Sequence, residues 1–582
     1  MQITGSQLII NSLIEEGVDK IFAYPGGYDK DIFDALYHEK DIELILPRHE
    51  QGLIHAAEGY ARSTGKVGVC LVTSGPGATN LVTGIADANY DGIPLVCFTG
   101  QVATSVIGND AFQEVDIVGI TRTISKYSTT IRKREDLGRA IKEAFYIARA
   151  GKPGPVIVDL PSNIVSEIGP AEYPETVNIR GYKPSTGVHI GQIKKALEML
   201  KNAKKPLFLI GGGVNISHAN EEFEKLVNIT KVPVITTIMG KGAIPTKHPL
   251  FIGNVGMHGS YASNKAVNEC DVLFSIGTRF NDRVTGRIAE FAPNAKIIHI
   301  DIDSASISRN IVVNIPIVAD AKAAINELIP LAQELDTQKW VNQIKAWDKE
   351  YPVTAPSSVE GGISPQAIFE NLNKAFTEGI FLTDVGQHQM WTTQFLEMNK
   401  NKQLITSGGL GTMGFGLPAA IGAQLGNPDK RVVCIAGDGG VQMTIQELAT
   451  AVQLELPITL VIINNGFLGM VRQMQQFFHD KNYSGTCLRK RKSCEGKCNF
   501  DGSNIPRCCP PYTPDFIRLA ESYGAYGIRV TDEDKLNDAF EEAKKNTDSP
   551  TIIEILIDFK DVVLPMVQGG KALDNMLLET NY

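Results

Sequence analysis

Short apolar runs alternate with segments of helical pattern along most of the chain. The first series of runs lies at residues 20–23, 67–72, 95–98 and 156–159. A second series lies at residues 206–210, 232–236, 272–276 and 297–302. Apolar runs of about four to eight residues, separated by helical patterns, are typical of buried parallel strands joined by helices. The chain is therefore predicted to have an α/β fold built from doubly wound parallel sheets.

A third series of runs carries the most specific chemical pattern. The apolar run 432–436 ends in Gly437-Asp438-Gly439, and the apolar run 458–463 leads directly into Asn464-Asn465. Between them, apolar residues from 445 to 452 recur at the spacing of one helix face. The segment is therefore predicted to form a strand, an amphipathic helix and a second strand.

Two polar, proline-containing stretches separate the three series. They lie at residues 170–184 and 354–362. A length of 582 residues suits several domains of ordinary size. No internal repeat is visible in the sequence itself. We expect domains at residues 1–168, 188–335 and 363–560, followed by a C-terminal tail at 561–582.

Composition and charge narrow the class of partner. A hydrophobic content of 43% supports sizeable cores, and the net charge is -9 with a pI near 5.7. An acidic chain lacks the basic surplus that neutralises nucleic-acid phosphates. The N-terminus has neither a basic nor an apolar leader pattern, and no apolar run approaches a membrane span. We expect a soluble, cytoplasmic protein that acts on small molecules and binds neither nucleic acid nor membranes.

The Gly437-Asp438-Gly439 motif predicts a site for a diphosphate held through a divalent metal ion. Glycines at a strand end let backbone N–H groups approach phosphate oxygens. Asp438 and Asn465 would supply a carboxylate and an amide oxygen, which are suitable ligands for Mg²⁺. The alternative is an ordinary turn between a strand and a helix, because Gly-Asp-Gly alone is common. The spacing to Asn465 favours the metal site.

This arrangement resembles the diphosphate-binding motif of thiamine-diphosphate (ThDP) enzymes. Such enzymes also need a glutamate against the aminopyrimidine ring, where its carboxylate promotes removal of the C2 proton. Glu50, which precedes the helical pattern at residues 56–62, is the candidate. The alternative for Glu50 is a solvated surface glutamate, the commoner fate of this residue type.

Further motifs resemble the catalytic large subunits of the acetolactate synthase (acetohydroxyacid synthase) family over nearly the whole chain. In chain order, the motifs are Tyr24-Pro25-Gly26-Gly27, Pro47-Arg48-His49-Glu50, Thr73-Ser74-Gly75-Pro76-Gly77-Ala78-Thr79-Asn80, Asp110-Ala111-Phe112-Gln113-Glu114, Gly256-Met257-His258-Gly259, Arg279-Phe280-Asn281-Asp282-Arg283, His299-Ile300-Asp301-Ile302-Asp303, Val385-Gly386-Gln387-His388-Gln389-Met390-Trp391 and Ser407-Gly408-Gly409-Leu410-Gly411. The resemblance implies three domains that bind the ThDP pyrimidine, FAD and the ThDP diphosphate, in that order.

The resemblance also implies the residues that hold each cofactor. Asp438, Asn465 and the carbonyl of Phe467 would hold Mg²⁺, and Met413 would force the bent shape of ThDP. Core packing is the alternative for Met413. The ThDP-contacting residues implied are Gly27, Gln387, His388, Gly411, Met413, Gly437, Gly439, Gly440, Leu468 and Met470. The FAD-contacting residues implied are Lys152, Gly211, Gly212, Thr237, Ile238, Met239, His258, Gly277, Arg279, Asp282, Asp301, Ile302, Asp320 and Ala321. Taken alone, Gly211-Gly212-Gly213 need be no more than a tight turn.

The implied reaction joins pyruvate to a second 2-ketoacid and gives 2-acetolactate for branched-chain amino acid synthesis. Arg283 would clamp the carboxylate of the acceptor, and Gln113 and Phe112 would line the same pocket. The site would lie between two subunits of a dimer or tetramer, and binding of a small regulatory subunit is left open. Alternatives are a ThDP carboligase with another carbonyl acceptor, a 2-ketoacid decarboxylase, or an inactive homologue that binds or regulates.

Several positions depart from the usual pattern of the family. Tyr28 follows Pro-Gly-Gly where a small residue is common, Ser162 replaces a usual lysine, and Met474 replaces a usual tryptophan. Lys152 stands where arginine is common. The first three lie near the expected acceptor channel, so they leave the choice of acceptor open.

A cysteine-rich insertion occupies residues 487–511. Its cysteines are Cys487, Cys494, Cys498, Cys508 and Cys509. Their spacing fits neither a standard zinc finger nor a C-x-x-C redox pair. A surface loop with reduced thiols, a metal- or disulfide-stabilised knob and a redox-sensitive lid are the three interpretations.

Overall fold

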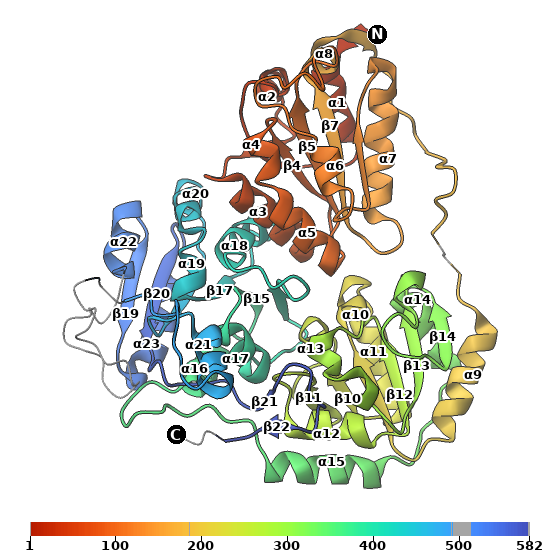
Figure 1. Cartoon of the computed structure of the whole chain (residues 1–582), viewed down its shortest axis with the longest axis vertical. Helices are drawn as coiled ribbons and strands as arrows, with labels where there is room; N and C mark the ends of the chain where they lie inside the picture. Colours follow the sequence, from red (N-terminus) through yellow and green to blue (C-terminus); the bar gives the residue numbers. More distant parts are fainter. Residues whose placement is uncertain (1, 185–186, 490–491, 493–513, 580–582) are drawn as a thin grey trace.

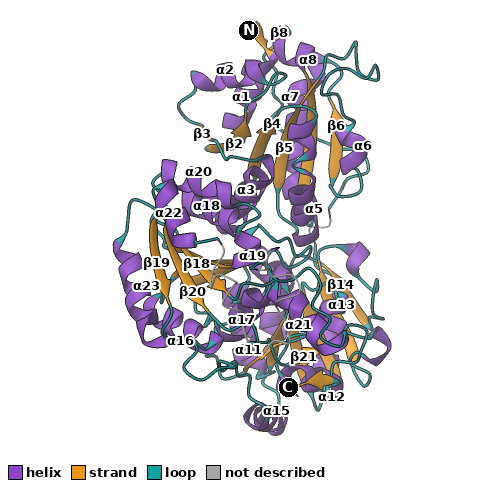
Figure 2. Cartoon of the chain, turned by 60° about the vertical axis from the view of Figure 1, so that its left-hand side comes forward, coloured by secondary structure: helices purple, strands orange, loops and turns teal. Residues whose placement is uncertain are grey.

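The computed structural model describes residues 2–184, 187–489, 492 and 514–579. It contains three six-stranded parallel sheets, each flanked by helices (Figures 1 and 2). The predicted α/β class is confirmed. We call the units built on these sheets the first, second and third domains, in chain order.

The first domain has its strands in the order β3-β2-β4-β5-β7-β6. The strands are β2 (Lys20–Tyr24), β3 (Glu43–Ile45), β4 (Gly68–Val72), β5 (Leu95–Gln101), β6 (Tyr127–Thr130) and β7 (Pro155–Pro161). The helices are α1 (Gly5–Glu15), α2 (Lys30–Tyr37), α3 (Glu50–Thr64), α4 (Pro76–Thr79), α5 (Val82–Asp91), α6 (Ile117–Thr121), α7 (Leu137–Arg149) and α8 (Ser162–Ser166). Strands β4, β5 and β7 are buried throughout, as expected for a parallel sheet covered on both faces.

The third domain repeats this topology, with the strand order β16-β15-β17-β18-β20-β19. The strands are β15 (Gly379–Thr383), β16 (Lys402–Thr406), β17 (Val432–Gly437), β18 (Thr459–Asn464), β19 (Tyr526–Val530) and β20 (Thr551–Leu556). The helices are α16 (Pro365–Ala375), α17 (Gln387–Phe395), α18 (Gly416–Gly426), α19 (Asp438–Val441), α20 (Leu448–Gln453), α21 (Gly469–Phe478), α22 (Phe516–Tyr523) and α23 (Leu536–Lys545). Numbered within each domain, both sheets have the order 2-1-3-4-6-5. The sequence shows no such repeat.

The second domain has a different order, β11-β10-β9-β12-β13-β14, which is 3-2-1-4-5-6 within the domain. The strands are β9 (Pro206–Ile210), β10 (Val234–Thr236), β11 (Phe251–Asn254), β12 (Val272–Ile276), β13 (Lys296–Asp301) and β14 (Ile315–Val318). The helices are α9 (Ile190–Lys201), α10 (Gly212–Ile216), α11 (Asn220–Thr230), α12 (Tyr261–Glu269), α13 (Asp282–Thr285), α14 (Ala321–Leu328) and α15 (Gln338–Glu350). This order is typical of dinucleotide-binding sheets, in which the ligand lies where the strand order reverses.

The first and third domains meet through helices α3 and α18 (Figure 1). A β-carbon added at Gly59 would lie 1.9 Å from the carbonyl oxygen of Ala419, and one added at Gly422 would lie 1.7 Å from that of Ala56. Glycine is therefore required at both crossing points, because any larger residue would separate the helices.

The connecting segments contain some regular structure. Residues 445–447 form a 3₁₀ turn before α20, where the sequence predicts a single helix. Strand β1 (Gln2–Thr4) pairs with β8 (Ile168–Pro170), and in the tail β21 (Met566–Val567) pairs with β22 (Met576–Leu577). No helix among the described residues has the length and apolar character needed to cross a membrane. The domain boundaries stay predictions.

Candidate active site

Asp438 and Asn465 lie together at the carboxyl edge of the third sheet. Asp438 begins α19 directly after β17, and Asn465 directly follows β18, the strand paired with β17. Parallel neighbours end at the same edge, so the sequence pattern brings these side chains to one place. Both are buried, with exposed fractions of 2% and 6%.

The residues at this edge fit a divalent cation. Among the described residues, Oδ2 of Asp438 has no hydrogen-bond partner although it is buried. Burial raises the pKa of Asp438 to about 7, so its ionised form needs a positive charge nearby. Oδ1 of Asn465 accepts a hydrogen bond from the Phe467 N–H at 3.0 Å. This bond keeps Phe467, whose carbonyl is the third expected metal ligand, close to Asn465. A carboxylate, an amide and a carbonyl are the donor types that Mg²⁺ prefers.

The glycines around Asp438 are in contact with other predicted ThDP residues. A β-carbon at Gly437 would lie 2.9 Å from Nδ1 of His388. At Gly439 it would lie 2.7 Å from Leu468 Cδ2 and 3.9 Å from Met413 Cε. At Gly440 it would lie 2.6 Å from Oδ1 of Asp384. The strand end is therefore closely packed, and a residue larger than glycine at any of these three positions would clash with the side chains named.

Gln387 and His388 lie in the first turn of α17, beside this edge. The Gln387 amide is held on three sides: Oε1 accepts from Asn465 Nδ2 at 3.1 Å, and Nε2 donates to Gln473 Oε1 and to the Asp561 carbonyl, both at 3.0 Å. Burial lowers the pKa of His388 to about 4, so its imidazole is neutral at pH 7. Asp561, in the predicted C-terminal tail, thus helps to hold Gln387 at the carboxyl edge of the third sheet.

Arg489 is a further residue at this edge, and no sequence motif identifies it. Its Nη2 donates to the Asn465 carbonyl at 2.6 Å, and its side chain is buried. The segment before Arg489 pairs with the loop at residues 466–468: the Leu468 N–H donates to the Thr486 carbonyl and the Leu488 N–H to the Gly466 carbonyl, at 2.8 and 2.9 Å. Cys487, the first cysteine of the insertion, lies in this pairing, opposite Phe467. Cys494, Cys498, Cys508 and Cys509 lie outside the described residues.

The first domain gathers a second group of predicted residues at the carboxyl edge of its own sheet. Glu50 is half-buried at the start of α3, and its Oε2 accepts from Asn80 Nδ2 at 2.9 Å. The Tyr28 hydroxyl donates to the Phe112 carbonyl at 3.0 Å, whereas the Phe112 side chain is 78% exposed. Gln113 has φ = +60°, an uncommon conformation for a residue other than glycine. Gly27 is also exposed.

A cavity of about 1060 Å³ lies where the three domains meet. Of the residues expected to contact FAD, its wall contains Lys152, Gly212, Thr237, Ile238, Met239, His258, Gly277, Arg279, Asp301, Ile302, Asp320 and Ala321. It also contains Gly411, Met413, Met470, Met474 and Arg283. Gly211 and Asp282 are not in the wall, nor are Glu50, Phe112 and Gln113.

Gly211 instead allows close contact between two loops at the cavity, at the point where the strand order of the second sheet reverses between β9 and β12. A β-carbon at Gly211 would lie 2.2 Å from the carbonyl oxygen of Gly277, so the loops after β9 and β12 touch. Asp320 caps α14 by accepting from the Ala323 N–H at 3.0 Å. Asp282 and Arg283 form a 3.0 Å ion pair with each other, and both side chains are largely exposed, at 75% and 59%. The cavity wall fits a dinucleotide in residue type and in its place at the strand switch.

Comparison with known proteins identifies the same three units. Residues 3–120, 193–328 and 384–555 match the N-terminal TPP binding domain, the central domain and the C-terminal TPP binding domain of thiamine pyrophosphate enzymes. Thiamine pyrophosphate is the same compound as ThDP.

Curated relatives match nearly the whole chain. The acetolactate synthase isozyme 3 large subunit of Escherichia coli (strain K12) is 42% identical over 99% of this chain and 98% of its own length. The acetolactate synthase large subunits of Cyanidium caldarium and Haemophilus influenzae are 44% and 42% identical over 99% of this chain, and over 96% and 98% of their own lengths. The chain therefore belongs to the acetolactate synthase large-subunit family of thiamine pyrophosphate enzymes.

Proposed function

We propose that the protein condenses pyruvate with a second 2-ketoacid, giving 2-acetolactate when both molecules are pyruvate, and that it uses ThDP, Mg²⁺ and FAD. The observation that carries the proposal is the buried pair Asp438 and Asn465 at the glycine-lined edge of the third sheet. Family membership supplies the reaction class, because the curated relatives are acetolactate synthases.

The third domain would hold the metal and diphosphate. Asp438, Asn465 and the Phe467 carbonyl would hold Mg²⁺, and the N–H groups after Gly437 would face the phosphate oxygens. Gln387 would keep Asn465 in place through their 3.1 Å hydrogen bond. When bound, ThDP supplies a carbon nucleophile for the ketone of pyruvate and retains the two-carbon unit after carbon dioxide leaves.

Glu50 would act on the cofactor of a partner subunit. Its carboxylate lies at the exposed edge of the first sheet and outside the cavity wall of its own chain. A dimer in which the first domain of one chain faces the third domain of the other would unite the two halves. Asn80 would orient the Glu50 carboxylate, since its amide donates to Oε2. A homo-oligomer is therefore part of the proposal.

The acceptor would lie on the apolar side of the cavity. Met413, Met470 and Met474 line this side, and a water-poor surface favours loss of a charged carboxylate as carbon dioxide. Arg283 is exposed enough to exchange Asp282 for the carboxylate of the acceptor, which its planar fork would hold with two hydrogen bonds.

FAD would occupy the larger part of the cavity, against the second domain. The 3-2-1-4-5-6 strand order and the contact between Gly211 and Gly277 support a dinucleotide there. The cationic side chains of Lys152 and Arg279, which line the cavity, would interact with the negatively charged diphosphate of FAD. A cytoplasmic location and a small regulatory subunit stay predictions.

Product analysis tests the proposed reaction. Purified protein supplied with ThDP, Mg²⁺, FAD and pyruvate should form acetolactate. Acetaldehyde without acetolactate would favour a simple decarboxylase, and absence of any product in a cofactor-saturated sample would favour a non-catalytic homologue. A competition between pyruvate and 2-ketobutyrate as acceptors would then define the acceptor, for which Tyr28, Ser162 and Met474 leave the choice open.

A further inference from the structure

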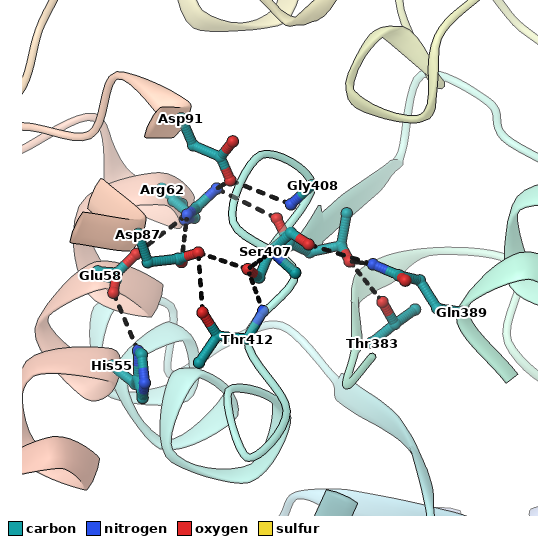
Figure 3. A network of polar contacts seen from close by, with 12 residues as sticks. His55, Glu58, Arg62, Asp87, Asp91, Thr383, Gln389, Ser407, Gly408 and Thr412 are labelled. Atoms are coloured by element: carbon teal, nitrogen blue, oxygen red, sulfur yellow. Dashed lines mark hydrogen bonds and ion pairs between the residues drawn. The ribbon is translucent and has the colours of Figure 1, made fainter. Parts of the chain in front are cut away.

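A buried polar network joins the first and third domains of the same chain (Figure 3). Its centre is Arg62 of α3, which forms ion pairs of 3.0–3.1 Å with Glu58, Asp87 and Asp91. All four side chains are at most 5% exposed. Of the four ion-paired residues, Asp91 lines the cavity and Glu58, Arg62 and Asp87 do not, whereas Ser407 and Gly408 of the third domain also line it.

The carboxylates of α5 reach across the domain boundary to the loop at residues 407–412. Oδ1 of Asp87 accepts from the Ser407 hydroxyl, and Oδ2 of Asp91 accepts from the Gly408 N–H at 3.1 Å. The Ser407 Oγ in turn accepts from the N–H groups of Gly411 and Thr412 at 3.1 and 2.9 Å. Ser407 thus fixes the course of the loop, and Asp87 fixes Ser407.

This loop leads directly to Met413 at the carboxyl edge of the third sheet, where the Met413 Cε would lie 3.9 Å from a β-carbon added at Gly439. The other end of the loop is held within the third domain, where the Asp384 carboxylate accepts from the N–H groups of Gly414 and Gly416 at 3.0 and 3.1 Å. Met413 therefore lies between two anchors. One belongs to its own domain and the other, Asp87, to the first domain.

We propose that Asp87 is a positioning residue for catalysis, because through Ser407 it holds the loop that carries Met413 against the cofactor. The proposal rests on the proposed function, in which Met413 supports the bent form of ThDP. In this arrangement the first domain does more than supply Glu50, since it also sets the cofactor-facing loop of its own chain.

The charges of the network suit a rigid anchor. Three carboxylates surround one guanidinium. Two further charges lie nearby: Arg279, whose Nη2 is 4.0 Å from Asp91, and Asp384, which directly follows β15 and acts on His55. Burial raises the pKa of Glu58 and of Asp87, which places a proton within the pair near neutral pH. Burial lowers the pKa of His55 to about 4, so His55 adds no charge. Removal of one partner from a network this enclosed leaves the other polar groups buried without a partner, which lowers the stability of the arrangement.

Exchange of the C2 proton of bound ThDP tests the role of Asp87 without substrate. The holoenzyme carrying Ser407→Ala should bind ThDP and Mg²⁺ but exchange C2 at least about tenfold more slowly, the scale of a mispositioned catalytic group. Asp87→Asn keeps the size and one acceptor oxygen and should cause a smaller loss in the same direction. Ser12→Ala is the matched control, because the buried Ser12 hydroxyl donates to the Leu8 carbonyl at 2.7 Å within α1, outside the network, and this variant should exchange like wild type.

A double variant, and exchange measured per bound ThDP, distinguish an effect on the position of the loop from an effect on the stability of the protein. Asp87→Asn combined with Ser407→Ala should be no slower than Ser407→Ala alone, because both act through one contact. Exchange is counted per bound ThDP, so loss of folded protein does not imitate the effect. Wild-type exchange in Ser407→Ala and Asp87→Asn, with only the melting temperature lowered, would overturn the proposal. A wild-type protein that exchanges C2 but makes no acetolactate would contradict the proposed condensation and leave the role of Asp87 standing.

Discussion

The first and third domains share one strand order, yet their predicted site residues differ in exposure to solvent. We call the two sets of residues the open half and the closed half of the proposed site. The predicted residues of the third domain are enclosed: Asp438, Asn465, Gln387 and His388 are all buried. In the first domain, by contrast, Phe112 is 78% exposed and Glu50 half-buried. The same topology thus supports a closed edge, where we propose that the metal and diphosphate bind, in the third domain and an open surface in the first. The difference agrees with the proposal that the open half is completed by a second chain.

The largest expected effect comes from the closed half. Asp438→Asn removes the carboxylate proposed to hold the metal, so binding of ThDP with Mg²⁺ should weaken at least about 100-fold, within the range for loss of a charged partner in a buried site. Titration calorimetry with ThDP and Mg²⁺ measures this. Asp429→Asn, on the exposed surface of the same domain, is the control. Unchanged affinity in Asp438→Asn would place the metal elsewhere.

A substitution in the open half should slow the reaction of the cofactor and leave cofactor binding intact. Glu50→Gln keeps the size of the side chain but loses its charge, so C2 proton exchange should fall by about 10²-fold or more while ThDP stays bound. Glu135→Gln, on the exposed surface of the first domain, should exchange like wild type. Retained exchange in Glu50→Gln would refute the role given to Glu50.

Mixing the two variants tests how the halves combine. If each site unites the first domain of one chain with the third domain of another, a mixed dimer of Glu50→Gln and Asp438→Asn subunits contains one intact site. Activity should then reappear on mixing and subunit exchange, up to about half of wild type per mixed dimer, as isologous pairing requires. No recovery in a mixture shown to contain mixed dimers would indicate that both halves come from one chain.

A smaller effect is expected where the cysteine-rich insertion begins. Arg489→Met removes the 2.6 Å hydrogen bond to the Asn465 carbonyl and should raise the Mg²⁺ concentration needed for ThDP binding by about tenfold, typical of a lost charge-assisted hydrogen bond. Arg489→Lys keeps the charge but not the planar fork and should lie between Arg489→Met and wild type. Arg518→Met, on an 86% exposed side chain, is the control. An unchanged requirement for Mg²⁺ would show that Arg489 only packs.

The sequence predicted inner strands of each sheet and the meeting of Asp438 with Asn465, because apolar runs and their terminal residues are local features. It did not predict the six edge strands, nor β15 and β20 of the third sheet. It did not predict the repeated strand order, since apolar runs are alike whichever neighbour they pair with. Arg489 depends on pairing between residues 466–468 and 486–488 that no motif marks. Asp87 and Ser407 are 320 positions apart, and each alone is a common polar residue. Only their burial together gives them a role.

The smallest expected effect concerns the pH dependence of the contact between the two domains. Burial raises the pKa of Glu58 and of Asp87 to about 7, above ordinary values of 4.5 and 3.8. Between about pH 4.5 and pH 7 the folded chain therefore holds more protons than the unfolded chain. The free energy of unfolding contributed by these groups is largest below that window and falls as pH rises through it.

Glu58→Gln isolates this contribution from all other titrating groups. The variant keeps the size of the side chain but cannot ionise, so the stability of wild type relative to the variant should decline from pH 5 to pH 7. The slope should be at most about 1.4 kcal/mol per pH unit for one group. Chemical unfolding of both proteins at each pH measures it. Parallel stability curves over this window would mean that Glu58 is ionised in the folded protein, with Arg62 compensating its burial, and the network would then be a plain ion-pair cluster that holds no proton.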